Sequence, residues 1–275
     1  MQLHPTCTRH ALAAPGQVAP ENHAGMFRSL CACFLSVFIR VRLWLRRKSL
    51  SVLRHRPELL FFALAICVAN APLLTGHWWQ ALTFQPEAVR AGQWWRLLTH
   101  PFVHVTWYHL LLDGAAFFVL YVGLLEKSLG RRLACILGAA IGSLAAAWSS
   151  PTAAMGLCGL SGVAHGLMAI SALELLSARK PHSAEWRVGL ATFALVVGKA
   201  AYEALAGRMF FAFLDLGLLG SPVSVSHAGG IMGGITMSLI LSLGKTHKSR
   251  LLRGEPRPPL GGSCEIGSPQ NAPSH

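Results

Sequence analysis

Ser161 lies between Leu160 and Gly162 in the stretch MGLCGLSGVAHGL (155–167), at the start of an apolar run of membrane-spanning length. A serine hydroxyl becomes a good nucleophile when a base removes its proton. A hydroxyl placed in lipid needs a partner or a function. An isolated Gly-x-Ser-Gly segment in a transmembrane helix is more often a close helix-packing surface. The chemical interpretation of Ser161 therefore depends on the rest of the chain.

His227 is the candidate base, because histidine is the side chain that most often accepts a proton in catalysis. It is followed by Ala and two glycines, and Gly159 and Gly162 flank Ser161 in a similar way. Small residues allow helix backbones to approach closely. The sequence therefore predicts that the helices carrying Ser161 and His227 pack closely enough for a direct hydrogen bond.

An acyl-transfer site also needs donors that stabilise the oxyanion. The backbone amide of Ser161 and the side chain of His109 are the candidates. The spacing of His100 and His104 would suit metal ligands, but both lie in a predicted loop without a cysteine or carboxylate cluster nearby. We favour structural hydrogen-bonding roles for these two, and we predict no metal site.

The composition indicates a membrane protein. Of the 275 residues, 53% are hydrophobic and 13% are charged, which is too apolar for an ordinary soluble domain. The net charge of +13 comes from basic clusters beside apolar runs, which is how membrane topology is set, so we do not expect nucleic-acid binding. The seven cysteines show no paired spacing, and the sequence implies no disulfide framework and no cofactor.

We expect an all-α, polytopic bundle of six transmembrane helices. The predicted spans are 58–75, 105–125, 133–150, 155–176, 188–207 and 222–243. The surrounding segments divide the chain into a disordered tail (1–25, after which Met26 is an alternative start), a basic interfacial segment (26–56), the six-span domain (57–245) and a disordered C-terminal tail (246–275).

The positions of Lys and Arg predict the topology. They gather before the first span, between spans two and three, between spans four and five, and after span six, whereas the other loops hold only Arg90, Arg96 and Arg208. Cytoplasmic loops carry the basic excess, so both termini are predicted to be cytoplasmic. Spans four and six then both enter from the outer face, and a rise of 1.5 Å per residue places Ser161 and His227 about 8 to 10 Å below that interface.

The chain resembles the rhomboid family of intramembrane serine proteases in five motifs, which occur in the expected order. These are Trp94-Trp95-Arg96, the histidine-rich entry into the second span (His100 to Asp113), Gly123-Leu-Leu-Glu126-Lys127-Ser-Leu-Gly130, which resembles the family's Gly-x-x-x-Glu-x-x-x-Gly turn, Gly159-Leu160-Ser161-Gly162, and Ser226-His227-Ala228-Gly229-Gly230. Five ordered motifs are far more specific than one.

The resemblance implies a Ser161 nucleophile and a His227 general base, with no third carboxylate required. His109 and the residue at 113 would line the oxyanion hole. The resemblance also gives His104 a role in organising the first loop, places His165 where an aromatic residue often packs on the catalytic histidine, and makes Gly159 and Gly162 packing residues.

Asp113 departs from the family pattern, because rhomboids usually have asparagine there. An ionised aspartate would repel a developing oxyanion. It would have to be protonated and donate, or pair with His109 or His165 as an orienting carboxylate. An inactive rhomboid-like protein that binds transmembrane helices is the alternative this residue supports. A small transporter is a second rival, since polar residues in spans also mark solute paths.

His165 and the fifth-span residues Lys199 to Gly207 resemble a narrower branch, the rhombosortases, which is associated with processing C-terminal Gly-Gly-containing anchors of exported bacterial proteins. Lys199 and Glu203 lie four residues apart, and we favour a structural ion pair between them over a role for Glu203 at the substrate entrance.

The sequence thus predicts an intramembrane serine endopeptidase that cleaves a peptide bond in or next to a transmembrane segment of another membrane protein. Its expected partners are that substrate and the lipid bilayer. The resemblance implies a location in the bacterial inner membrane, with the active site opening to the outer face.

Overall fold

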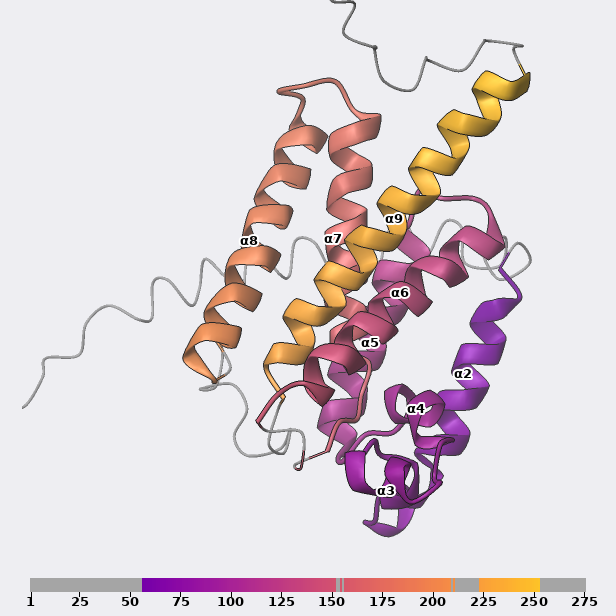
Figure 1. Ribbon diagram of the computed structural model, residues 1–275, viewed down its shortest axis with the longest axis vertical. Helices are drawn as coiled ribbons and strands as arrows, with labels where there is room; N and C mark the ends of the chain where they lie inside the picture. Colours follow the sequence, from indigo (N-terminus) through magenta and orange to yellow (C-terminus); the bar gives the residue numbers. More distant parts are fainter. Residues whose placement is uncertain (1–55, 152–153, 155, 209, 211–222, 253–275) are drawn as a thin grey trace, which may run out of the picture. The chain divides into compact units, whose positions relative to one another are not determined.

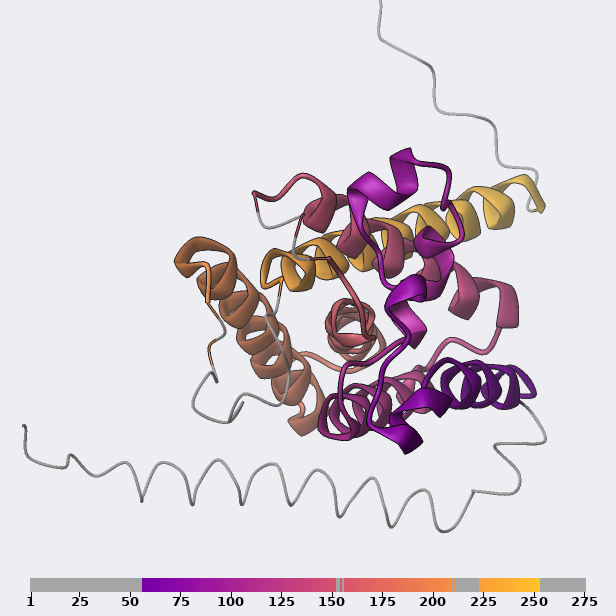
Figure 2. The same ribbon diagram turned by 90° about the horizontal axis from the view of Figure 1, so that it is seen from below.

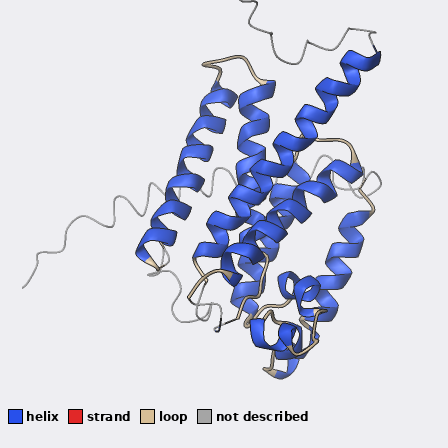
Figure 3. Ribbon diagram, viewed as in Figure 1, coloured by secondary structure: helices blue, strands red, loops and turns tan. Residues whose placement is uncertain are grey.

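The computed structural model describes residues 56–151, 154, 156–208, 210 and 223–252, with side chains as far as Gly244. The predicted tail 1–25, the predicted interfacial segment apart from Arg56, and the last part of the predicted C-terminal tail lie outside these residues. Within them the secondary structure is helical, and the one β-contact is an isolated bridge between Phe84 and Leu157 (Figure 3).

The longer helices are α2 (Glu58–Ala69), α5 (Trp107–Gly123), α6 (Leu129–Trp148), α7 (Ser161–Ala178), α8 (Ala184–Ala206) and α9 (Val225–Leu252) (Figure 1). Short helices connect α2 to α5: η1 (Ala71–Thr75), η2 (Gln80–Leu82), α3 (Pro86–Arg90), α4 (Arg96–Thr99) and η3 (His100–Phe102). We call residues 76–106 the first loop.

Five helical segments of the described residues are long and apolar enough to cross a bilayer: 58–75, 129–148, 161–178, 184–206 and 225–244. A sixth span results if Arg96–Phe102 and Trp107–Gly123, which meet at 93°, are counted together. The prediction of an all-α, polytopic membrane bundle is confirmed. Helix α9 continues to Leu252, past the predicted domain end at residue 245.

Helix α7 occupies the centre of the bundle, where it packs against α5, α6, α8 and α9 (Figure 2). Its buried residues point in all directions around the helix, and many of them are Gly or Ala. Small residues on every side allow four neighbours to approach one helix. The residues at the start of α7 are therefore enclosed by the bundle.

The fourth span begins later than predicted. Residues 156–160 are not helical, and α7 starts at Ser161 itself. Gly156 and Gly159 have φ values of 81° and 94°, which lie outside the right-handed helical region. Ser161 is thus the first helical residue, whereas the sequence placed it one or two turns inside the helix.

The first loop is held by hydrogen bonds to its own backbone. The buried Arg96 donates from Nη1 to the carbonyl oxygens of Gln80 (2.8 Å) and Thr83 (2.6 Å), and Thr99 Oγ1 donates to the carbonyl of Leu82 (2.7 Å). Buried carbonyls in a loop need such partners. Arg96, from the Trp-Trp-Arg motif, therefore fixes the shape of this loop.

A second set of contacts joins the first loop to the segment before α7. Phe84 and Leu157 exchange two backbone hydrogen bonds of 3.0 Å, and the N–H of Gly159 donates to the carbonyl of His100 (3.0 Å). These bonds fix the non-helical residues that lead into Ser161.

Candidate active site

The serine and histidine segments meet where α7 crosses α9. A Cβ atom added to Gly230 would overlap the carbonyl oxygen of Gly162, and one added to Gly162 would lie 3.1 Å from the carbonyl oxygen of Ser226. Ser161 immediately precedes Gly162, and His227 immediately follows Ser226. The predicted close packing of these two helices through small residues is thus present, but within the described residues no hydrogen bond joins the side chains of Ser161 and His227.

His165 lies between the serine and the histidine. Its Nδ1 is 2.7 Å from the carbonyl oxygen of Ser161, one turn earlier on α7. Its ring stacks on that of His227, with centroids 4.0 Å apart and planes inclined by 11°. His165 therefore contacts both the backbone of Ser161 and the candidate base.

The buried carboxylate of Glu203 contacts the candidate base in addition to its predicted partner, Lys199. Glu203 Oε2 lies 2.7 Å from His227 Nδ1, and Glu203 is fully buried. The predicted pair with Lys199 is present as well, at 2.8 Å. Glu203 is thus a partner of the candidate base in addition to being half of an ion pair.

Lys199 completes this network. Its Nζ is 2.9 Å from Glu203 Oε2 and 2.9 Å from His165 Nε2. An ammonium only donates and an ionised carboxylate only accepts. A single assignment then satisfies all the contacts: His165 Nε2 accepts from Lys199, His165 Nδ1 donates to Ser161, and His227 Nδ1 donates to Glu203.

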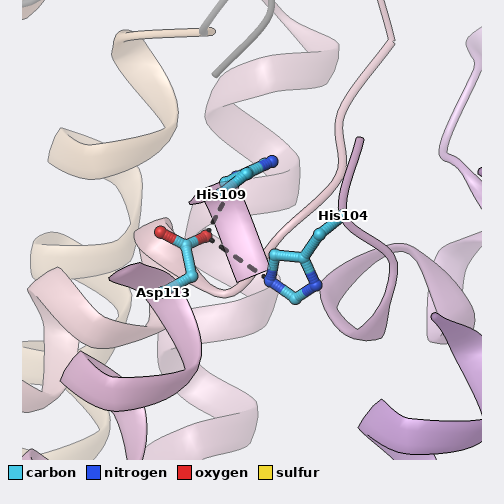
Figure 4. A group of neighbouring side chains, drawn as sticks. All are labelled: His104, His109 and Asp113. Atoms are coloured by element: carbon cyan, nitrogen blue, oxygen red, sulfur yellow. Dashed lines mark ion pairs between the residues drawn. The ribbon is translucent and has the colours of Figure 1, made fainter. Parts of the chain in front are cut away.

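A second cluster contains His104, His109 and Asp113 (Figure 4). Asp113 Oδ2 lies 3.1 Å from His109 Nε2 and 3.7 Å from His104 Nε2. His104 is fully buried, and its backbone N–H donates to Asn70 Oδ1 (2.8 Å). Burial lowers the pKa of His104 to about 4, so its imidazole is neutral near pH 7.

Gly159 connects this second cluster to the serine. A Cβ atom at Gly159 would lie 2.6 Å from His109 Nε2 and 2.7 Å from Asp113 Oδ2. Only glycine has both the space and the backbone freedom for this position. The His109–Asp113 pair therefore lies against the backbone two residues before Ser161.

A family model described as Rhomboid domain matches residues 91–244, more than half of the chain. The chain belongs to the rhomboid family. The matched region begins in the first loop, ends in α9, and contains all of the site residues described above. This rhomboid is accordingly an integral membrane protein of a family of intramembrane proteases. No curated protein and no solved structure matches the chain.

Among the contacts that sequence reasoning missed in this rhomboid, the most consequential is the one between Glu203 and His227. A signal was present, because the predicted topology places Glu203 near the outer end of its span, at the end of the bundle where Ser161 and His227 lie. A carboxylate within a span needs partners. Lys199 was an obvious partner by its spacing, and the histidine on a different span was not.

Proposed function

We propose that this rhomboid is a serine endopeptidase that cleaves a peptide bond in or next to a transmembrane segment of another membrane protein. The observation that carries the proposal is the contact of buried Glu203 with His227 Nδ1 at 2.7 Å. It directs the Nδ1 proton toward the carboxylate and leaves Nε2 as the acceptor. Ser161 is the hydroxyl whose helix packs against this histidine.

In the proposed reaction, Ser161 Oγ attacks the substrate carbonyl as His227 Nε2 takes the hydroxyl proton. Glu203 stabilises the imidazolium that forms. His227 then returns the proton to the leaving amine, and a water molecule hydrolyses the acyl enzyme by the same steps in reverse order. Glu203 would act through His227, so it is a positioning residue.

The oxyanion would be stabilised by the backbone N–H of Ser161. His109 could add a second donor only after substrate displaces one of its ring contacts, because its Nδ1 accepts from Val105 N–H and its Nε2 contacts Asp113. The first N–H groups of a helix have no carbonyl partner inside it, and Ser161 is the first residue of α7. The 3.1 Å contact with His109 Nε2 supports the orienting interpretation of Asp113, in which the carboxylate fixes the His109 ring beside Gly159. His104 Nε2 lies 3.7 Å from the same Asp113 oxygen, and the His104 ring packs edge-on against the His109 ring with centroids 4.9 Å apart, so His104 would support this pair.

The substrate should be a membrane protein whose helix unwinds easily, because helical hydrogen bonds hide backbone carbonyls from attack. We further propose that the substrates include C-terminal Gly-Gly-type anchors of exported proteins, as in rhombosortases. The residues that carry this narrower resemblance, His165, Lys199 and Glu203, form one connected network with His227, which supports the proposal. The proposed location is the bacterial inner membrane, with cytoplasmic termini and a site open to the outer face.

The test is cleavage of reporter membrane proteins by the purified full chain in proteoliposomes. One reporter carries a Gly-Gly-containing C-terminal anchor, and its matched partner has Leu-Leu in place of Gly-Gly. We expect cleavage by the wild type, faster for the Gly-Gly reporter, and none by Ser161→Ala. The control is Ser171→Ala, because the buried Ser171 hydroxyl on the same helix has no hydrogen-bond partner to lose.

Equal cleavage by Ser161→Ala and wild type would contradict the proposed nucleophile. Equal rates for the two reporters would contradict the Gly-Gly preference alone. Capture of the reporter without cleavage by a folded wild type would favour the alternative function, a binder of transmembrane helices, for which Asp113 is the main support.

A further inference from the structure

His104, His109 and Asp113 bring three potential metal-ligand atoms together. One nitrogen from each imidazole and one carboxylate oxygen all lie within 4.8 Å of one another. His104 comes from the first loop, and His109 and Asp113 come from successive turns of α5. Their side chains point toward a shared centre (Figure 4).

Several of these polar atoms lack hydrogen bonds. Both ring nitrogens of His104 and Oδ2 of Asp113 are buried without a hydrogen bond, although Asp113 Oδ2 keeps its 3.1 Å ion-pair contact with His109 Nε2. Buried polar atoms in native proteins are nearly always satisfied, so three such atoms in one cluster require an explanation. A cation between them would satisfy His104 Nε2 and Asp113 Oδ2 together.

The geometry suits a small divalent ion. Zinc binds histidine nitrogen and carboxylate oxygen at about 2.0 to 2.2 Å, so neighbouring ligands of a tetrahedral site lie about 3.3 Å apart. The distances from Asp113 Oδ2 to the two Nε2 atoms are 3.1 and 3.7 Å. Binding through His109 Nε2 requires the ring proton to lie on Nδ1, which releases the long contact (3.5 Å) from Val105 N–H, and it replaces the direct contact between His109 Nε2 and Asp113 Oδ2 by bonds to the ion.

Neighbouring residues hold His104 in place, whereas the side chains of His109 and Asp113 are partly accessible to solvent. Asn70 fixes His104, since it accepts from the His104 backbone N–H and donates to the carbonyl of Phe102 (2.6 Å). The side chains of His109 and Asp113 remain 10% and 12% exposed, which gives an ion a route of entry. An ion could therefore enter and leave past His109 and Asp113 while His104 keeps its position.

We propose that His104, His109 and Asp113 bind a zinc-type divalent ion, and that the metal-bound protein is proteolytically inactive. Bound to metal, His109 is not available as a second donor to the oxyanion. The inhibitory part rests on the proposed protease function, and the binding part does not. Asp113 supplies the anionic ligand that asparagine, the usual residue at this position in rhomboids, would not supply. This proposal replaces the sequence-based expectation of no metal site.

The other cluster of ligand types, His165, Glu203 and His227, is a poorer candidate although its atoms also lie within 4.8 Å of one another. Lys199 already contacts His165 Nε2 and Glu203, and His227 Nδ1 contacts Glu203. An ammonium in the cluster repels a second cation. A variant in this cluster serves as the control.

The binding experiment uses the full chain, purified in detergent with a tag that contains no histidine. Zn²⁺ is titrated in competition with a chromogenic chelator. We expect one strong site in the wild type and in His165→Gln. We expect Asp113→Asn and His104→Gln to bind more weakly by at least about tenfold, the loss that follows removal of even an outer-shell partner of a metal. Wild-type affinity in both variants would overturn the proposal.

A measurement on the wild type alone keeps the proposal testable if the variants do not fold. Co²⁺ should give the intense visible absorption of a four-coordinate site with nitrogen and oxygen ligands, and Zn²⁺ should abolish it. Absence of this band at saturating Co²⁺ would overturn the proposal.

The inhibitory part is tested by fluorophosphonate labelling of Ser161 with and without Zn²⁺. We expect Zn²⁺ to suppress labelling of the wild type and to have at least about tenfold less effect on Asp113→Asn. Labelling of Ser161 that persists with the metal bound would overturn the proposal that the metal inhibits the protease. Metal binding by a protein that neither labels nor cleaves would contradict the protease function and leave the metal site supported.

Discussion

Glu203 Oε2 lies 2.7 Å from His227 Nδ1, so a fully buried carboxylate of α8 contacts the imidazole at the start of α9. The rhomboid resemblance requires only a serine and a histidine. In this chain the histidine has a third group that fixes its tautomer, and Lys199 balances the charge of that group. The predictions below follow from this network and from the packing that positions it.

Glu203→Gln should reduce kcat for reporter cleavage by up to about 10⁴-fold with little change in KM, the loss that follows when the orienting carboxylate of a Ser-His-Asp triad becomes an amide. A glutamine NH₂ can donate to Nδ1 and so favour the tautomer whose Nε2 cannot accept the serine proton. Steady-state kinetics in proteoliposomes measure this. The matched control is Glu185→Gln, an exposed residue at the other end of α8, and a parallel loss in both variants would contradict a specific role for Glu203.

Lys199→Met should destabilise the protein by about 3 kcal/mol, because it leaves the buried Glu203 carboxylate without its cation. The double variant Lys199→Met/Glu203→Gln should recover part of this loss and remain inactive. Thermal unfolding in detergent measures the stabilities. A double variant that is less stable than Lys199→Met alone would show that the two side chains are not coupled as described.

Gly230→Ala should destabilise the bundle by about 1 to 3 kcal/mol and reduce cleavage, because its methyl group would overlap the Gly162 carbonyl and separate the serine helix from the histidine helix. Gly198→Ala is the control, since no atom lies within 4 Å of its added Cβ. Unfolding and cleavage are measured for both. Unchanged activity in Gly230→Ala would mean that this close approach does not position the site.

Arg96→Leu should destabilise the first loop by about 2 to 3 kcal/mol, because the buried carbonyl of Thr83 and the partly buried carbonyl of Gln80 lose a charged donor. Arg90→Leu is the matched control, since its ion pair with Glu87 is exposed and such pairs contribute little. Hydrogen exchange of residues 80–105 reports the local effect. Equal exchange in the two variants would contradict the role assigned to Arg96.

The sequence predicted the features of the fold that depend on local composition and on the order of motifs. Apolar runs and basic loops identified the spans, and the glycines around Ser161 and His227 identified the α7–α9 contact. Relationships between spans were harder to predict. The Glu203–His227 contact depends on how α8 packs against α9. The spacing of residues along α8 alone does not predict that packing.

The start of α7 illustrates a second limit. Hydropathy predicts that the fourth span starts at residue 155. In the structure two glycines with positive φ precede Ser161, and the helix begins only at that residue. The pairing of His104 with Asp113 likewise depends on how the first loop folds against α5, which the histidine spacing did not specify.

The most direct test of the account is labelling of the detergent-solubilised protein with a fluorophosphonate serine probe, in the wild type, Ser161→Ala and His227→Ala. We predict labelling of the wild type, none in Ser161→Ala, and loss in His227→Ala of at least about 10²-fold in rate. Labelling of Ser161→Ala, or undiminished labelling of His227→Ala, would contradict a Ser161 nucleophile activated by His227.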